Sequence, residues 1–446
     1  MAIRKSVLRL APLLAAALLA ACGSAPVGPD YRQPADALAS QPDAARPFLG
    51  APAGASGAMF SPEPLPAQWW RLYQDARLDR LVVQALERNT DLRQAAANLE
   101  RMQAIEDEVA GGKRPSFVVS GGPSYGHAVG HSMPNAFHYS LGASLSYQVD
   151  LFGQIERALE AASAGSAGAQ AALDLVRVNV AAGTARAYAE VCTTGLRLQS
   201  ARRSVEVQAE ALNVSERLER AGRVSIIDTT RARGQLRQLE AALPPLLAQR
   251  QGALYRLATL TGVLPQDFDR EVAECTAPPR VAGPLPVGDG AALLRRRPDI
   301  RQAERGLAEA TARIGVAMAD LYPKVTLGLS AASAGPGSDF GGRDTFSWSL
   351  GPLITWTIPN TGIAQARVAQ AEAATRAAAA RFDTTVLTAL RETEAALNAY
   401  ARELDRRANL QAARDSSAAA AEQARDLYIK CRIGYLEALD AERTRS

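Results

Sequence analysis

The chain has 446 residues, a formal net charge of +4, 47% hydrophobic residues and only 5% aromatic residues. Basic and acidic residues are spread along the chain without a basic block, which argues against a nucleic-acid partner. No apolar run reaches the roughly 18 residues that a membrane-spanning helix needs, so a polytopic helical membrane protein is excluded. The abundance of alanine among arginine and glutamate is typical of long helices packed at close range.

The N-terminus has the pattern of a bacterial lipoprotein signal. Basic residues precede a short apolar run that ends in Leu19-Ala20-Ala21-Cys22. We therefore expect residues 1–21 to be a signal peptide and the Cys22 thiol to carry diacylglycerol, with palmitate on the mature chain; the alternative is an ordinary signal peptide with a chance cysteine. Gly23, where an inner-membrane lipoprotein would have Asp, favours the outer membrane. Residues 22–68 are rich in Pro, Ala and Gly and are expected to form a lipidated, extended tether.

The rest of the chain is a tandem duplication. The segment D-L-R-Q-A at Asp91 recurs as D-I-R-Q-A at Asp299, and Pro115 matches Pro323 at the same offset of 208 residues. We assign residues 69–283 to the first repeat and residues 284–446 to the second. Each repeat is expected to contain a helical stretch, a pair of strands and a long helical hairpin. In the first repeat the initial helical stretch is expected over residues 69–114.

Each predicted strand pair alternates strictly between apolar and small polar residues. In the second repeat one face carries Phe346, Trp348, Leu350, Pro352, Ile354, Trp356 and Ile358, and the other carries Ser347, Ser349, Gly351, Leu353, Thr355 and Thr357. The first repeat alternates in the same way from residue 137 to residue 149, and the preceding strands start at Pro115 and Pro323. This pattern over about ten residues is typical of transmembrane β-barrels, although a half-buried soluble sheet would also show it. Four strands cannot close a barrel around a pore, so several chains must share one.

A very long helix follows each strand pair. No proline interrupts the chain from Gly153 to Ala221 or after Gly362, so each helix spans about 68 residues, or roughly 100 Å at 1.5 Å per residue. Such helices must pack lengthwise against neighbours, as in a coiled coil. Tight turns are expected at residues 221–225 and 431–434, and Pro244-Pro245 is expected to kink the returning helix.

Several motifs together resemble those of the outer-membrane factor family. They are the lipobox followed by G-P-D-Y, the W-W-x-x-Y-x-D motif from Trp69, L-L-R-R-R-P-D-I-R from Leu293 and W-S-L-G-P from Trp348. The chain resembles most closely the lipoprotein branch of NodT/OprM-like efflux proteins, which is similar in architecture to TolC. The resemblance implies a mainly α fold with a β-barrel part, in which a homotrimer builds one 12-stranded barrel and a periplasmic helical duct. It also implies a periplasmic adaptor (membrane fusion) protein and a proton-driven inner-membrane pump of the RND type as partners.

The helix turns are the candidate gate of such a duct, because a duct that stayed open at rest would leak. The resemblance implies a ring of acidic and other side chains near the second turn. The candidate residues at the two turns are Asp426, Arg425, Asp228, Glu437, Gly222, Val224, Ser225, Ile433 and Gly434. Solvated charges on a helix exterior are the alternative for each of the charged residues.

The second repeat departs from the first at its end. Only 15 residues follow Cys431, whereas 40 separate Gly222 from Gly262, and the family's usual glycine at the second turn is a cysteine. We expect either a truncated copy without function or a trimer that closes with a shorter final helix.

No enzyme motif is present in the sequence. Gly111-Gly112-Lys113-Arg114 lacks the spacing and the Ser/Thr of a phosphate-binding loop. His127, His131 and His138 lie in and beside a loop between strands without a metal-ligand pattern, so neither a metal nor another cofactor is expected. A disulfide between Cys192 and Cys275 is plausible in an oxidising periplasm, with two unpaired thiols as the alternative.

Three functions are compatible with these features. The leading one is a passive exit duct of a tripartite efflux system for drugs or small toxic compounds. The second is an exit duct for type I protein secretion, and the third is a structural periplasm-spanning lipoprotein. The sequence does not identify the exported substrate.

Overall fold

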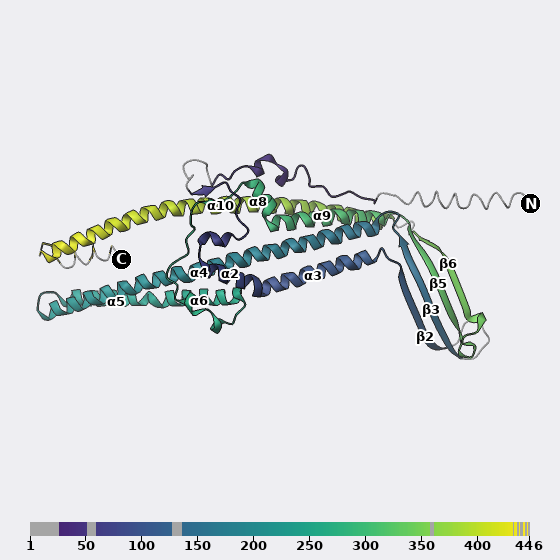
Figure 1. The fold of residues 1–446 in the computed structure, drawn as a ribbon, viewed down its shortest axis with the longest axis horizontal. Coiled ribbons are helices and arrows are strands. Elements are labelled where there is room, and N and C mark those ends of the chain that lie inside the picture. The colour runs from purple at the N-terminus through teal and green to yellow at the C-terminus, as the bar shows by residue number, and fades with distance from the viewer. Residues whose placement is uncertain are drawn as a thin grey trace, which may run out of the picture. The chain divides into compact units, whose positions relative to one another are not determined.

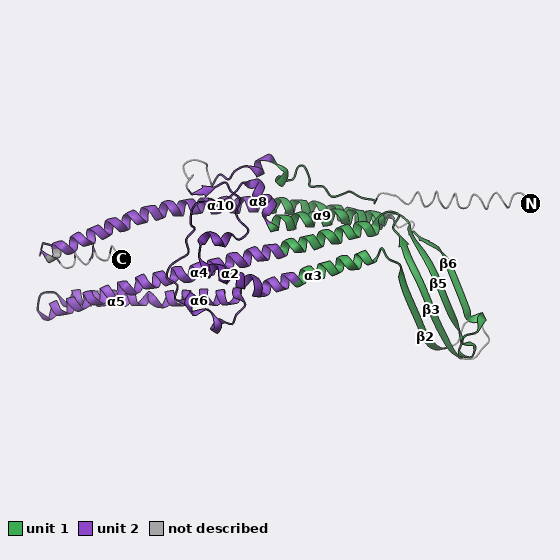
Figure 2. Ribbon diagram, in the orientation of Figure 1, with its two compact units in different colours: residues 1–41, 97–172, 298–386 green, residues 42–96, 173–297, 387–446 purple. Residues whose placement is uncertain are grey.

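The computed structural model describes residues 26–50, 59–126, 136–356, 361–430 and 432–434, together with a few single residues after them. The chain forms two compact units, and each unit draws on both repeats (Figure 2). Unit 1 consists of Met1–Gln41, Ala97–Ala172 and Pro298–Val386, and unit 2 consists of Pro42–Ala96, Leu173–Arg297 and Leu387–Ser446.

Unit 1 contains a four-stranded antiparallel sheet in the order β2-β3-β5-β6 (Figure 1). Its strands are β2 (Ser116–Gly126), β3 (Ala136–Val149), β5 (Lys324–Pro336) and β6 (Phe346–Thr355). Strands β2 and β5 each begin one residue after the proline that was expected to open them. Proline has no N–H group for a sheet ladder, so it is best tolerated at the start of a strand or on an edge strand. The two short 3₁₀ turns η5 (Gly337–Asp339) and η6 (Arg343–Thr345) connect β5 to β6.

Long helices flank the strand pairs in the same order in both repeats, as the duplication predicts. In the first repeat α3 (Thr90–Gly111) precedes the strands and α4 (Gln154–Arg220, 67 residues) follows them. In the second repeat α9 (Pro298–Ala319) precedes the strands and α10 (Thr361–Ile429, 69 residues) follows them. At 1.5 Å per residue, α4 and α10 are each about 100 Å long. None of the helices in the described part of the chain has an apolar stretch long enough to cross a bilayer.

The helical stretch expected over residues 69–114 consists of three helices: η3 (Trp69–Tyr73), α2 (Ala76–Arg88) and α3. Asn89 separates the last two, because its Oδ1 atom accepts hydrogen bonds from the backbone N–H groups of Asp91 (2.9 Å) and Leu92 (3.1 Å) and so caps α3.

The Pro244-Pro245 pair does not kink one returning helix but separates two. Helix α5 (Ile226–Ala241) ends before the prolines, and α6 (Leu243–Thr261) begins with them in its first turn. The missing N–H of proline costs least in a first turn, where the N–H groups have no partner within the helix.

Unit 2 has a hydrophobic core built from several helices. Side chains of η3, α2, α4 and α6 meet there, including Trp70, Leu78, Val82, Val191 and Leu254, each at most 7% exposed. The remaining elements of this unit are η4 (Pro265–Asp267), α7 (Arg270–Ala273), α8 (Gly290–Arg296), η2 (Pro42–Ala45) and the two-residue parallel strands β1 (Phe60–Ser61) and β4 (Leu285–Pro286).

The segment expected to be an extended tether has little regular structure, but it packs against the body of the protein where it is described. In unit 1 a hydrogen bond from the Leu38 N–H to Asp383 Oδ1 (2.9 Å) holds the short 3₁₀ turn η1 (Leu38–Ser40) against α10. In unit 2 the N–H groups of Leu49 and Gly50 donate to the two carboxylate oxygens of Glu394 (2.8 and 2.7 Å). This segment is therefore part of the fold as well as a link to the N-terminus.

Candidate functional site

The register of the sheet places the large apolar side chains of all four strands on one face. Directly paired residues of an antiparallel sheet lie on the same side, and Leu145 pairs with both Phe117 and Leu329, which in turn pairs with Leu350. Trp348 and Leu350 are 69% and 71% exposed, so the chain itself does not cover them. This apolar face consists of Phe117, Val119, Tyr125, Phe137, Tyr139, Leu141, Leu145, Tyr147, Val149, Val325, Leu327, Leu329, Phe346, Trp348, Leu350 and Ile354.

The opposite face is lined mostly by hydroxyl groups and glycines. Ser144 pairs with Ser330, which pairs with Ser349, and the hydroxyl oxygens of Ser330 and Ser349 are 2.8 Å apart. In the four described strands Lys324 is the one side chain with a permanent charge. This polar face carries Ser116, Ser120, Ser124, Ser140, Ser144, Ser146, Thr326, Ser330, Ser347, Ser349 and Thr355. Val118 and Leu353 are the apolar exceptions on it. The two faces match the alternation predicted for the described strand residues; Thr357 and Ile358 lie outside them.

In the part of the chain that the structure describes, β2 and β6 each have one neighbour, so the two outer edges of the sheet are unpaired there. The strands of this sheet contain three prolines: Pro123 on β2 and Pro352 on β6 lie on these edge strands, and Pro336 is the last residue of β5. Edge strands with free backbone groups tend to pair with another chain unless they are covered. The sheet can therefore be extended from either side.

The first helix turn joins α4 to α5 in a tight αL turn. Gly222 has φ +70°, a conformation that favours glycine, and the N–H groups of Gly222 and Arg223 donate to the carbonyls of Glu219 and Leu218 (both 2.9 Å). Ser225 then caps α5 by accepting a hydrogen bond from the Ile227 N–H (3.1 Å). The turn exposes Ile226 (68%) and Ile227 (57%), which is unusual for large aliphatic side chains.

The second helix turn repeats part of this hydrogen-bonding pattern. The Arg432 N–H donates to the Leu427 carbonyl (2.8 Å), and both residues lie 209 positions after Arg223 and Leu218. Cys431, at the position that corresponds to Gly222, lies outside the described residues. The duplication therefore reaches as far as the ends of the long helices.

The candidate gate residues lie at or beside these two turns. Asp228 is in the first turn of α5, half-buried, next to Val224 and Ser225. Arg425 and Asp426 are exposed in the last turns of α10, and the Asp426 carbonyl accepts a hydrogen bond from the Lys430 N–H (3.1 Å). Ile433 is half-buried, whereas Gly434 and Glu437 are exposed. The gate assignment remains a prediction.

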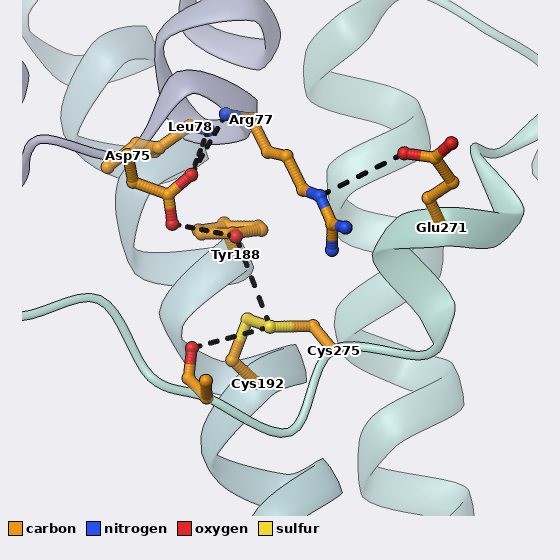
Figure 3. Close-up of a disulfide and its surroundings, with 8 residues drawn as sticks. Asp75, Arg77, Leu78, Tyr188, Cys192, Glu271 and Cys275 are labelled. Atoms are coloured by element: carbon orange, nitrogen blue, oxygen red, sulfur yellow. Dashed lines mark hydrogen bonds and ion pairs between the residues drawn. A yellow bond between two sulfur atoms is a disulfide. The ribbon is translucent and has the colours of Figure 1, made fainter.

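A disulfide fixes a loop of unit 2 to α4 (Figure 3). It joins Cys192 on α4 to Cys275 just after α7, with their Cα atoms 4.7 Å apart and a sequence separation of 83. The contact is close: a Cβ atom at Gly195 would lie 2.1 Å from the Cys275 carbonyl oxygen, so glycine is needed there. The disulfide is a covalent tie across the core cluster of this unit.

Next to the disulfide, Tyr188 connects α4 to the start of α2, a link that the sequence did not single out. Its hydroxyl donates to Asp75 Oδ2 (2.9 Å), while Asp75 Oδ1 accepts from the N–H groups of Arg77 and Leu78 and so caps α2 (Figure 3). Burial, followed by the hydrogen bond to Asp75, raises the pKa of Tyr188 to about 12. The aspartate before the periodic residues of α2 was the available signal for the cap, but its pairing with a tyrosine 113 residues later was not visible in the sequence.

One of the three histidines singled out in the sequence lies within the residues that the structure describes. His138 lies on the polar face of β3, opposite Ser124 and Pro336, and His127 and His131 lie outside the described residues. Among the residues that the structure describes, no group of three or more His, Cys, Asp or Glu side chains is arranged to hold a metal ion.

An exposed apolar sheet face, a hydroxyl-lined opposite face and a helix of about 100 Å after each strand pair define a membrane-duct protein. The model of the family described as "Outer membrane efflux protein" matches residues 81–263 and 291–445. The chain belongs to this outer-membrane efflux protein family, and it is an outer-membrane exit duct for efflux that extends into the periplasm.

Individual relatives agree with this assignment. The chain is 30% identical over 452 residues to the toluene efflux pump outer membrane protein TtgI of Pseudomonas putida, with 97% of the chain and 91% of the relative covered. It is 26% identical over 387 residues to the probable outer membrane lipoprotein SilC of Salmonella typhimurium, with 84% and 81% covered. Among solved structures, the outer-membrane channel OprN superimposes with a TM-score of 0.84 at 34% identity, over 94% of this chain and 93% of that one.

Proposed function

We propose that three copies of the chain form one passive channel, with a 12-stranded barrel in the outer membrane and a helical duct in the periplasm. The observation that carries this proposal is the four-stranded sheet with one apolar face, one hydroxyl-lined face and two unpaired edges. Pairing β2 of one copy with β6 of the next satisfies both edges, since a closed barrel has none. Two copies would give eight strands, an interior that side chains fill, whereas three give room for a lumen.

In this arrangement the apolar face contacts lipid and the polar face lines the lumen. Exposed side chains such as Trp348 and Leu350 then lie in hydrocarbon, which accounts for their exposure in the single chain. The lumen presents hydroxyl groups, to which water and small polar or amphiphilic molecules bind only weakly. Transport through it needs no energy from this protein.

We further propose that the duct belongs to a tripartite efflux system of the RND type. An inner-membrane pump and a periplasmic adaptor protein would supply drugs or other small toxic compounds to it. The names of relatives, such as a toluene efflux pump component, support this class of cargo. The two helix turns, with Ile226 and Ile227 exposed at the first, are the surface proposed for the adaptor and for closure at rest, with Asp426 in the constriction.

Lipid attachment at Cys22 completes the proposal, and the similarity to a probable outer membrane lipoprotein supports it. Radiolabelled palmitate should be incorporated into the wild-type chain, while Cys22→Ser should give an uncleaved or mislocalised precursor without label. Normal labelling of Cys22→Ser would contradict the attachment site.

Single-channel recording in planar lipid bilayers tests the duct itself. Purified native trimers should give discrete, reproducible conductance steps, and a heat-denatured sample of the same preparation serves as the control. Intact trimers without conductance under any applied voltage, or protein that is monomeric after gentle extraction, would contradict the proposed channel.

A further inference from the structure

Arg157, in the first turn of α4, is an arginine with a side chain only 5% exposed. Arginine is seldom buried unless its charge is paired. Its Nε and Nη2 atoms donate to the carbonyls of Val27 and Gly28 (both 3.1 Å), and Nη2 also contacts Asp30 Oδ1 (2.7 Å). Its Nη1 atom donates to Glu160 Oε2 (2.7 Å) on the same helix. Three of these four contacts therefore hold the N-terminal segment and only one holds the helix.

The positive charge of Arg157 is stabilised by the two carboxylates that its guanidinium contacts. Burial lowers its pKa, but the hydrogen bonds to Glu160 and Asp30 outweigh that effect and the pKa is raised overall. A guanidinium group is suited to this role because its planar fork can reach several oxygens at fixed angles.

Two glycines let the backbone of this segment approach the body closely. Gly28 has φ +92°, and a Cβ atom there would lie 2.5 Å from the Cα atom of Gly315 on α9. Gly153 has φ +72°, and a Cβ atom there would lie 2.4 Å from Cβ of Pro26. The Val27 N–H in addition donates to the Phe152 carbonyl (3.1 Å). The Arg157 side chain, a backbone hydrogen bond and the space left by two glycines thus all hold residues 26–30 against the body of unit 1. We call residues 26–30 the docked segment.

The docked segment lies beside aromatic residues at the helix-side end of the sheet. Phe152, which follows β3, stacks on Tyr322, which precedes β5, with ring centroids 4.5 Å apart. Trp356, which follows β6, donates from Nε1 to the Leu321 carbonyl (3.3 Å). Aromatic girdles of membrane barrels lie at the level of the lipid headgroups. In the proposed barrel, this end of the sheet and the docked segment beside it would lie at the level of the lipid headgroups.

Chain length then limits where the lipid on Cys22 can be. Pro26 is four residues after Cys22, and an extended chain spans at most about 3.3–3.6 Å per residue, or about 14 Å in total. We propose that Arg157, Gly153 and Gly315 form a docking site for residues 26–30 that holds the diacylglyceryl group of Cys22 beside the base of the same chain's sheet. This inference rests on the proposed lipid attachment at Cys22. In this proposal Arg157 is a positioning residue. The partner of the docked segment is a membrane leaflet.

The experiment uses cells grown with a palmitate analogue that carries a diazirine and an alkyne. After irradiation and purification of the full-length trimer, crosslinked peptides are identified by mass spectrometry. In the wild type we expect crosslinks from the Cys22 acyl chains to concentrate on the helix-side ends of the strands, within residues 147–152 and 322–327. Hydrogen–deuterium exchange of residues 26–38 measures docking independently of the lipid.

Two variants release the docked segment by different routes. Arg157→Ala removes the guanidinium, whereas Gly28→Ala changes only the segment, so it keeps the test valid if loss of Arg157 impairs folding. Both should speed exchange in residues 26–38 about tenfold or more, because Arg157→Ala removes the hydrogen bonds from the guanidinium and the Cβ atom of Gly28→Ala would collide with the backbone of Gly315. Both should also reduce the crosslinks at the strand ends at least about fivefold. Arg177→Ala, which removes an exposed arginine paired with Asp174 (2.9 Å) on α4, is the matched control and should leave both readouts unchanged.

The outcomes separate this inference from the proposed lipid attachment. An acylated Cys22 whose crosslinks avoid the strand ends in the wild type, or persist unchanged in both variants, would overturn the docking site. A wild-type chain that incorporates no analogue would overturn the lipid attachment and with it the anchoring role. Acylated chains that lose exchange protection and strand-end crosslinks together in both variants would support the docking site.

Discussion

Adjacent arginine substitutions on β6 test which face of the sheet contacts lipid. Leu350 pairs with Leu329 on the apolar face, and Ser349 pairs with Ser330 on the polar face. Leu350 is the fifth of the ten residues of β6, which places it near the middle of the apolar band. Leu350→Arg and Ser349→Arg therefore introduce the same side chain at the same depth on opposite sides.

The expected costs differ because only one of the two charges leaves water. An arginine facing lipid near the midplane lowers the free energy of unfolding by about 2–4 kcal/mol per chain. This amounts to about 6–12 kcal/mol per trimer if the three sites act independently. Ser349→Arg loses the contact between two hydroxyl groups 2.8 Å apart, worth about 1 kcal/mol, and its charge stays in the aqueous lumen. Leu350→Ala, which removes the side chain without adding a charge, separates lost apolar contact from the cost of the charge.

Two measurements on purified trimers check this prediction. The urea midpoint of unfolding should fall much further for Leu350→Arg than for Ser349→Arg or Leu350→Ala. In bilayers under a salt gradient, Ser349→Arg should shift the reversal potential toward anion selectivity, because it adds three positive charges to a lumen whose described strands carry one lysine per chain. Equal destabilisation by the two arginines, or none by Leu350→Arg, would refute the assignment of the faces.

Three further predictions concern unit 2. Reduction of the disulfide, or Cys192→Ser with Cys275→Ser, should lower the free energy of unfolding by about 2–5 kcal/mol, because the crosslink closes a long loop of 83 residues; equal urea midpoints with and without reductant would contradict this. Since the pKa of Tyr188 is raised from its usual 10 to about 12, its stabilising effect is complete below pH 10 and is lost as the pH rises toward 12. Tyr188→Phe should cost about 1 kcal/mol at pH 8, and its unfolding midpoint should fall less than that of the wild type between pH 10 and 12. Asp426→Ala should raise single-channel conductance and weaken cation block from the periplasmic side, and unchanged conductance with intact trimers would remove Asp426 from the gate.

The architecture of the strands and long helices was predictable because it depends on local patterns. Strict alternation over β3 and β6 fixes which residues share a face, since a shift of one residue would turn every apolar side chain to the other side. Uninterrupted, alanine-rich sequence predicts α4 and α10 to within one or two residues of their observed ends. The duplication predicts the same order of elements twice, and the matching hydrogen bonds at Leu218 and Leu427 show how far it extends.

Local caps set the helix boundaries that the sequence interpretation missed. Asn89 ends one helix and starts the next through its own side chain, and Pro244-Pro245 begins a helix where a kink within one helix was expected. Both signals were present in the sequence. A polar side chain inside a periodic stretch can hydrogen-bond to the backbone and so competes with continuation of the helix. The outcome depends on which backbone carbonyl and N–H groups still lack a hydrogen-bond partner once the neighbouring helices have packed.

Only the tertiary structure decided the long-range contacts. The sequence gives no reason why Arg157 should bond to residues 27–30 rather than to solvent, or why Tyr188 should meet Asp75, because each pair is separated by more than 100 positions. Such contacts depend on where complete helices lie after packing, and burial then makes each unpaired polar group costly. The segment after Cys22 shows the difference most clearly: its composition predicts an extended chain, but Arg157 on α4 and Asp383 on α10 determine the path of the residues that the structure describes.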